Sequence, residues 1–347
     1  MAVRELARSR RTAHLALFDA TTLIAKGVKE QLLARKFPIA SVRLYTSQED
    51  PEQNLTEFGE EAMLVSRPDP EALGPLDIAF LCGAPDEGAR YLDWPDRGKF
   101  VAIDLTNASN EASGIPLVNA DVNPAAIIAR PGVIAAPHPI AHALSSLLAP
   151  IQRGPGLLEA AAVVLQPASD AGDAGIEELY RQTASLMNFQ DLPTAVFGRQ
   201  LAFNLLPAFL YKSGVAPGGA RPERIEREVR KVTGGEFGLS VEVLLAPVFH
   251  CHTILAHVVL PEGATRDDLL AGFDGNDAVQ IADAEGRATP VDRAGKTGLL
   301  LAGVRSAGRS SSFWALGIAD NLTSGTARNA VRIAEALLDQ GLVRGDA

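Results

Sequence analysis

Short apolar runs alternate with amphipathic stretches along the first 140 residues of the chain. Five of the runs have the length and boundaries of buried strands, and they are residues 13–18, 42–46, 78–82, 100–104 and 133–136. Between the first two, Ile24, Val28 and Leu32 recur at helical spacing within residues 22–36. This alternation predicts an α/β domain of the Rossmann type, in which helices cover both faces of a parallel sheet that binds nucleotides.

The pattern changes after Pro139. Longer strand-like runs follow at residues 160–166, 239–248, 252–260, 299–304 and 313–319, and helical patterns at 176–187, 223–232 and 325–342. Such a mixture is typical of an α+β domain. We therefore predict a Rossmann-type domain over residues 1–137 and an α+β domain over residues 138–324.

Composition narrows the classes of partner. The 347 residues are 47% hydrophobic and 21% charged, which is ordinary for a globular protein. The net charge of −10 argues against nucleic acid or an anionic membrane as the main partner. The basic start of the chain has no apolar segment after it, so we do not expect a signal peptide. Two cysteines, Cys82 and Cys251, predict a reducing compartment, so we expect a cytoplasmic protein.

Five segments, in the right order, resemble motifs of the aspartate-semialdehyde dehydrogenase family. The most specific is the stretch ADNLTSGTARNAVRIAE at residues 319–335, and the others are residues 166–179, 200–207, 247–252 and 292–296. The resemblance implies an NADP-dependent oxidoreductase of amino-acid biosynthesis. It also implies a homodimer formed through the sheet of the second domain, and a C-terminal segment 325–347 that completes the first domain.

The position of the catalytic nucleophile departs from this family. Where the family carries Asn-Pro-Asn-Cys, whose cysteine attacks the aldehyde, this chain has Ala136, Pro137, His138 and Pro139. Proline has no nucleophilic side chain, and the loss of a covalent nucleophile removes the step itself. The resemblance therefore implies a degenerate member that lacks the family reaction.

The dinucleotide turn departs in the same way. The family's GATGxVG corresponds to residues 19–25, where all three glycines are replaced and Asp19 adds a negative charge. Glu49 lies where the family binds the 2′-phosphate. The residues at family cofactor positions are Thr21, Thr22, Leu23, Ile24 and Asn321. An alternative reading makes Thr21 or Thr22 simply a helix N-cap. We expect no bound cofactor, although the resemblance implies NADP.

Two residues remain at catalytic positions of the family. His252 matches its acid–base histidine, and Gln166 matches the glutamine that orients the intermediate. Asn110 and Leu245 replace arginines that hold phosphate and the substrate carboxylate, and Pro222 replaces an acid. His252 and Gln166 are therefore interpreted as vestigial.

Histidines are concentrated in two segments, which raises a separate hypothesis. His138 and His142 would share a face if a helix began as early as His138, and His250 and His252 would share a strand face. In the family these segments meet, so His138, His142 and His252 are candidate ligands of a Zn²⁺-type metal site. In the alternative reading, His138 caps a helix that has Pro139 at its first position.

Three functional hypotheses follow. The first is a non-catalytic dimer with a structural, regulatory or ligand-sensing role, paired with an active paralogue. The second is an active NADP-dependent semialdehyde dehydrogenase whose catalytic residues are displaced. The third is new chemistry at a histidine-based metal site.

Overall fold

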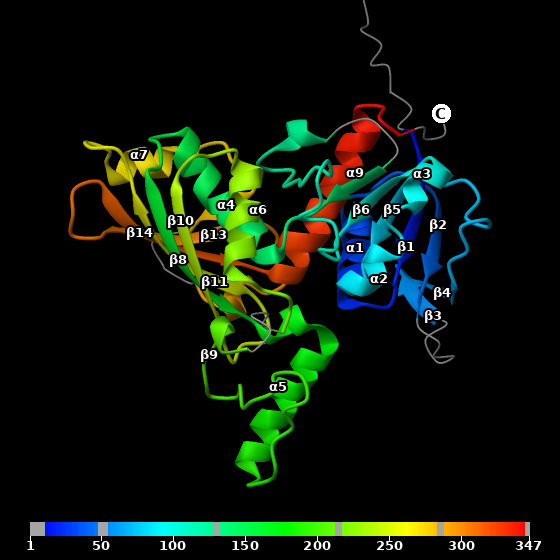
Figure 1. Cartoon of the computed structure of the whole chain (residues 1–347), viewed down its shortest axis with the longest axis horizontal. Coiled ribbons are helices and arrows are strands. Elements are labelled where there is room, and N and C mark those ends of the chain that lie inside the picture. The colour runs from blue at the N-terminus through cyan, green and yellow to red at the C-terminus, as the bar shows by residue number, and fades with distance from the viewer. Residues whose placement is uncertain (1–10, 48–54, 128–131, 212–216, 283–287, 344–347) are drawn as a thin grey trace, which may run out of the picture.

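The computed structural model of the protein describes residues 11–47, 55–127, 132–211, 217–282 and 288–343. They form two sheet-based bodies that lie side by side (Figure 1). The first sheet has the strand order β3-β4-β2-β1-β5-β6-β7. Its strands are β1 (Ala13–Phe18), β2 (Ile39–Tyr45), β3 (Leu55–Phe58), β4 (Glu61–Ser66), β5 (Ile78–Leu81), β6 (Val101–Asp104) and β7 (Gly132–Ala135).

The central strands β1, β5 and β6 of the first sheet are buried on both faces, which explains their continuous apolar runs. In β1, Leu15 and Leu17 point to a core shared with α1 and α9, whereas Ala16 and Phe18 point to a core on the opposite face. The helices of this body are α1 (Leu23–Ala34), α2 (Pro85–Ala89), α3 (Trp94–Gly98), α9 (Asn329–Asp339) and the 3₁₀ turn η2 (Pro124–Ala126). The last helix thus packs on the first domain, as predicted.

The second sheet has the order β12-β13-β14-β11-β8-β10-β9. Its strands are β8 (Glu159–Gln166), β9 (Leu206–Pro207), β10 (Gly238–Leu245), β11 (His252–Val259), β12 (Val279–Ile281), β13 (Leu299–Ser306) and β14 (Ser312–Ala319). Alternate residues of β8 are buried and exposed, so one face meets the core and the other meets solvent.

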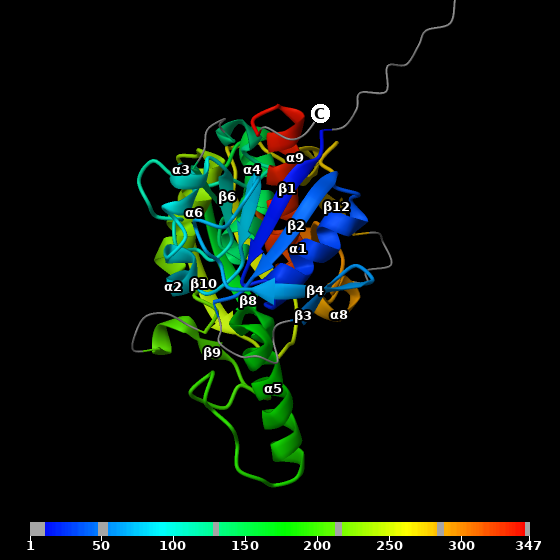
Figure 2. The same ribbon diagram turned by 90° about the vertical axis from the view of Figure 1, so that its right-hand side faces the viewer.

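Helices cover the inner face of this sheet, and α5 projects away from both sheets (Figures 1 and 2). The helical elements are α4 (Pro139–Arg153), η3 (Ala168–Ala171), α5 (Gly172–Met187), η4 (Ala208–Leu210), α6 (Pro222–Thr233), α7 (Arg266–Ala271), α8 (Pro290–Arg293) and the π-helical segment η5 (Asn321–Arg328). None of the helices in the described ranges is long and apolar enough to cross a membrane.

The α/β and α+β prediction is confirmed, with three corrections to detail. The hairpin β3–β4 was not predicted. The final helix was expected from residue 325, but a π-helical segment precedes α9, which begins at Asn329. His250 and Cys251 lie before β11 and outside the strand, and Cys251 has a φ of +75°, so the predicted shared strand face of His250 and His252 is wrong.

Candidate functional site

A cleft of about 390 Å³ lies where the two bodies meet. It opens at the carboxyl ends of β1, β5 and β6, where open α/β sheets bind their ligands. Its lining includes the start of α1, the loops after β5 and β6, Pro139 at the start of α4, and segments 169–172 and 321–322 of the second body. The cleft therefore gathers Pro139 and four of the five family cofactor positions, whereas His138, His142, Gln166 and His252 are not among its lining residues.

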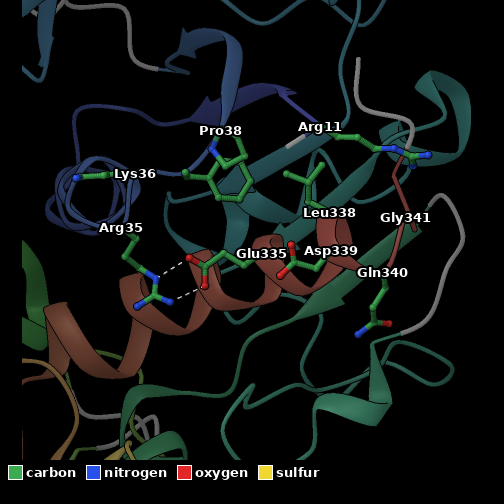
Figure 3. A pocket seen from close by; sticks show the side chains of 10 residues that line it. Arg11, Arg35, Lys36, Pro38, Glu335, Leu338, Asp339, Gln340 and Gly341 are labelled. Atoms are coloured by element: carbon green, nitrogen blue, oxygen red, sulfur yellow. Dashed lines mark hydrogen bonds and ion pairs between the residues drawn. The ribbon is translucent and has the colours of Figure 1, made fainter. Parts of the chain in front are cut away.

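A larger hollow of about 710 Å³ lies at the opposite end of the first sheet (Figure 3). Its lining includes Arg11 before β1, Pro38 before β2 and the end of α9. Across this hollow Arg35 makes two hydrogen bonds to Glu335, and the shorter distance is 2.6 Å. The charges of these two lining residues therefore neutralise each other. Since none of the sequence-predicted site residues lines this hollow, the cleft remains the candidate site.

Pro139 and His138 form the N-terminus of α4. His138 is the N-cap, and its Nδ1 accepts a hydrogen bond of 3.2 Å from the backbone N–H of Ile140. Pro139 is the first helical residue and lines the cleft, as the alternative reading of this segment predicted. The second imidazole nitrogen, Nε2, lies 3.2 Å from the carbonyl oxygen of Gly218. The ring of His138 is therefore fully occupied by backbone contacts.

His252 is buried beneath the cleft instead of facing it. Its Nε2 lies 2.7 Å from Asp170 Oδ2, and the two side chains are 0% and 4% exposed. Asn321 Nδ2 donates to the other carboxylate oxygen, Oδ1, at 2.7 Å. Burial raises the pKa of Asp170, but the charge of His252 and these hydrogen bonds outweigh it and hold that pKa below its usual value. Asp170 therefore stands between the family's acid–base position and the cleft.

Gln166, the other retained catalytic residue, holds a backbone segment. Its Nε2 donates to the carbonyl oxygen of Pro217 at 3.0 Å. The neighbouring Gly218 is so close that a β-carbon there would come within 2.5 Å of Gln166 Nε2 and 2.7 Å of Asp170 Cβ. Residues 217–218 thus occupy the space above Gln166.

The turn after β1 is closed by its own hydrogen bonds. Thr22 is the N-cap of α1, since its Oγ1 accepts from the N–H of Ala25, which confirms the capping reading. The same hydroxyl lies 3.1 Å from the carbonyl oxygen of Asp19 and 3.0 Å from that of Cys82. Of the family cofactor positions, Thr22, Leu23, Ile24 and Asn321 line the cleft, and Thr21 does not.

Asp19 places a buried negative charge in this turn. Its Oδ1 accepts from Ser47, at 3.0 Å from the N–H and 2.8 Å from the hydroxyl, which also contacts Glu87. Among the described residues Asp19 Oδ2 has no hydrogen-bond partner. A β-carbon on Gly83 would come within 2.4 Å of this oxygen and 2.6 Å of Glu87 Oε2, so the two carboxylates converge.

These residues do not fit the pyrophosphate of a dinucleotide. Burial raises the pKa of Asp19, with a further rise from Glu87, because the carboxylate lacks a cationic partner strong enough to offset both. A second anion at the same turn would add like-charge repulsion. Glu49, the other acid predicted to oppose NADP, lies outside the described residues.

Arg224 of α6 lines the cleft and forms an ion pair with Glu228 of the same helix. Arg224 Nε donates to Glu228 Oε1 at 2.8 Å, and its Nη2 donates to the carbonyl oxygen of Asn107. Glu228 also accepts from Asn110 Nδ2 and from the backbone N–H of His138. Asn110 thus joins the two bodies and offers no guanidinium for phosphate.

The predicted histidine metal site is not formed. His142 faces away from His138, toward Asp121 and Arg328, because α4 begins only after His138. His257 packs against Trp314 with ring centroids 5.0 Å apart. Over the described ranges, no three His, Cys, Asp or Glu side chains lie close enough together to hold a metal ion.

The cysteines are structural. Cys82 is buried in the core of the first body, as predicted. Cys251 is also buried, and its Sγ lies 3.3 Å from the carbonyl oxygen of Pro290. Burial raises the pKa of its thiol to about 12, so it does not supply a thiolate.

Sequence reasoning missed Asp170. It lies in the segment 166–179, which resembles the family motif QxxSGAGxxGIxEL from Gln166 onward, and it stands at the first glycine of that motif, so a local signal existed. Its partners His252 and Asn321 lie 82 and 151 positions away, and only the folded chain reveals the contact.

Comparisons with known proteins agree with the two-sheet fold. The sequence profile of the family "Semialdehyde dehydrogenase, dimerisation domain" matches residues 148–324. The chain is 26% identical to the aspartate-semialdehyde dehydrogenase of Rickettsia bellii over 94% of this chain and 97% of the relative. It is also 26% identical to the USG-1 protein homolog of Pseudomonas aeruginosa, with 94% and 97% covered. The crystal structure of aspartate semialdehyde dehydrogenase II from Vibrio cholerae is similar with a TM-score of 0.86, at 26% identity, and 95% and 99% of the two chains are covered.

Proposed function

The chain belongs to the semialdehyde dehydrogenase dimerisation-domain family, and from that premise we propose that it is a member without the family reaction. The proposal assigns it a structural, regulatory or ligand-sensing role, with an active paralogue as a partner. The observation that carries this proposal is Pro139, which lines the cleft at the position of the nucleophilic cysteine. No acyl–enzyme thioester forms on a proline side chain.

Two further features support the same proposal independently of Pro139. His252 is fully buried and bonded to Asp170, so it does not reach a substrate in the cleft. Asp19 and Glu87 converge at the dinucleotide turn, where NADP would need a cradle for its pyrophosphate. A single replacement at Pro139 would therefore not complete the missing machinery.

An active dehydrogenase with displaced residues is the alternative. Overall similarity does not decide between them, because relatives at 26% identity carry both the dehydrogenase and the USG-1 names. The alternative requires another reactive thiol beside the cleft. Cys82 lines the cleft, but burial raises the pKa of its thiol, and Cys251 is buried against Pro290. Within the described ranges, no cluster of potential ligands supports the metal-site alternative.

We also propose a homodimer built on the outer face of the second sheet. Val163 of β8 and Leu255 of β11 are cross-strand neighbours, and they are 39% and 40% exposed. Exposed apolar neighbours on a regular sheet favour burial against another surface, and a second copy of the same family domain is the simplest partner. The proposal places the dimer in the cytoplasm, in keeping with two free, buried cysteines.

The experiment is a pair of titrations on the purified chain. Melting temperature and intrinsic tryptophan fluorescence are followed with NADP⁺ and NAD⁺, and phosphate-dependent oxidation of aspartate semialdehyde is assayed in parallel. We expect no shift, no fluorescence change and no turnover, whereas an active relative serves as positive control. Tight NADP⁺ binding would refute the inference that Asp19 makes this turn unfit for pyrophosphate. Trapping a thioester would refute the proposal as a whole.

A further inference from the structure

The carboxylate of Asp170 is held like a bound anion. Each of its two oxygens lies 2.7 Å from a different nitrogen, Nε2 of His252 and Nδ2 of Asn321. The side chain is 4% exposed, so water does not satisfy it, and charge-assisted hydrogen bonds offset its desolvation. The contacts fix both the charge and the orientation of the carboxylate.

The two residues that hold the carboxylate, Asn321 and His252, also make contacts that do not involve Asp170. Asn321 Oδ1 accepts from the backbone N–H of Cys251 at 3.2 Å, which turns Nδ2 toward the carboxylate. Ser169 hydrogen-bonds the same amide at 3.0 Å. His252 is the first residue of β11, and its Cα is paired with Ala319 of β14. The amide of Asn321 is therefore oriented whether or not a carboxylate is present, and the strand pairing fixes the backbone from which the ring of His252 projects.

The side chain of Asp170 enters this place from the edge of the cleft. Asp170 lines the cleft, and the aligned family motif has glycine, with no side chain, at this position. Gly218 closes the other side, since a β-carbon there would meet Asp170 Cβ at 2.7 Å. Without its side chain, position 170 would leave a hole that adjoins the cleft and has two donors at its base.

We propose that His252 and Asn321 form a site for a small carboxylate, and that Asp170 fills it as a built-in ligand. The site is latent in the natural chain, and formate or acetate occupies it when the side chain of residue 170 is removed. This inference rests on the proposed function, because His252 does not act in catalysis while the carboxylate of Asp170 covers it.

The test is chemical rescue of stability. Asp170→Gly leaves two buried donors without an acceptor, so its melting temperature falls relative to the natural chain. Acetate at several hundred millimolar should raise the melting temperature of Asp170→Gly above the value in chloride at equal concentration. The expected rise is about 2 °C or more for each tenfold excess of acetate over its dissociation constant. Asp170→Asn, which keeps the space filled, and the natural chain are the controls, and both should respond equally to the two salts.

Two results would overturn the inference. One is an acetate effect of the same size in the natural chain and all variants, which would be a general salt effect. The other is an Asp170→Gly or Asp170→Ala chain that is destabilised or unrecoverable in acetate and in chloride alike. Recovery of folded variant only in acetate or formate would support it. The NADP⁺ and thioester assays are made on the natural chain, in which Asp170 occupies both donors, whereas the rescue is measured on Asp170→Gly, so failure here and failure of the proposed function are distinguishable.

Discussion

Pro139 lies against Gly325, where an added β-carbon would come within 3.3 Å of Pro139 Cα and 3.4 Å of its carbonyl oxygen. The contact joins the start of α4 to the π-helical segment η5. It involves the backbone of Pro139 and its Cβ, also at 3.4 Å, which every residue other than glycine carries. The position of residue 139 is therefore set by the fold, and the ring is replaceable.

This relationship predicts the outcome of Pro139→Cys. The variant should fold with a change in unfolding free energy within about 1 kcal/mol, because the helix start is otherwise retained. Its new thiol lies at the first position of a 15-residue helix and should react with iodoacetamide faster than the two buried natural thiols. Phosphate-dependent oxidation should stay absent. Recovered turnover would show that the remaining machinery is intact.

The unfolding free energy should depend on pH through His142. Burial lowers its pKa to about 4, and its Nε2 has no hydrogen-bond partner within the described part of the chain. Below pH 6.5 His142 binds a proton in the unfolded chain but stays neutral in the folded chain. The unfolding free energy therefore falls as the pH drops toward 4. The loss is at most about 3 kcal/mol. His142→Leu should flatten urea-midpoint profiles between pH 7 and 4.5, and unchanged slopes would contradict this.

Cys251 occupies a backbone conformation that favours glycine. Its φ of +75° lies in the left-handed region, where a side chain costs about 1–2 kcal/mol. Cys251→Gly relieves that strain and Cys251→Ala does not, although both remove the thiol. The glycine variant should therefore be more stable than the alanine variant by about 1 kcal/mol in urea unfolding. Equal midpoints would mean that the backbone is unstrained.

The proposed dimer predicts a matched pair of surface variants. Val163→Asp places a charge among apolar neighbours on the outer face of the second sheet, and it should weaken association at least tenfold in sedimentation. Leu64→Asp alters a side chain that is 76% exposed on the first sheet and serves as control. Equal dimer fractions in both variants would exclude this face as the interface.

The sequence predicted those features that depend on neighbouring residues. Thr22 as a helix cap and Pro139 at a helix start are local, because the capping bonds span two or three positions. The buried strands followed from their apolar runs for the same reason. The β3–β4 hairpin was missed because its strands are short and largely exposed, which leaves little periodic signal.

Features that depend on distant residues could not be predicted. The i and i+4 spacing of His138 and His142 wrongly predicted a pair of metal ligands. The ring of His138 accepts a hydrogen bond from the N–H of Ile140, and the ring of His142 faces Arg328. The partnership of Asp170 with His252 depends on the meeting of η3 and β11 in the fold. A buried acid beside a retained histidine is visible only once both are placed.

The path of the chain has a consequence for its synthesis. The core around β1 and α1 includes Ile333 and Leu337 of α9, so the first sheet-based body to leave the ribosome lacks part of its interior until α9 has been made. The strands and helices of the second sheet-based body all precede that closing helix in the chain. Nascent chains stalled before residue 327 should therefore expose apolar surface near the N-terminus and recruit chaperones there.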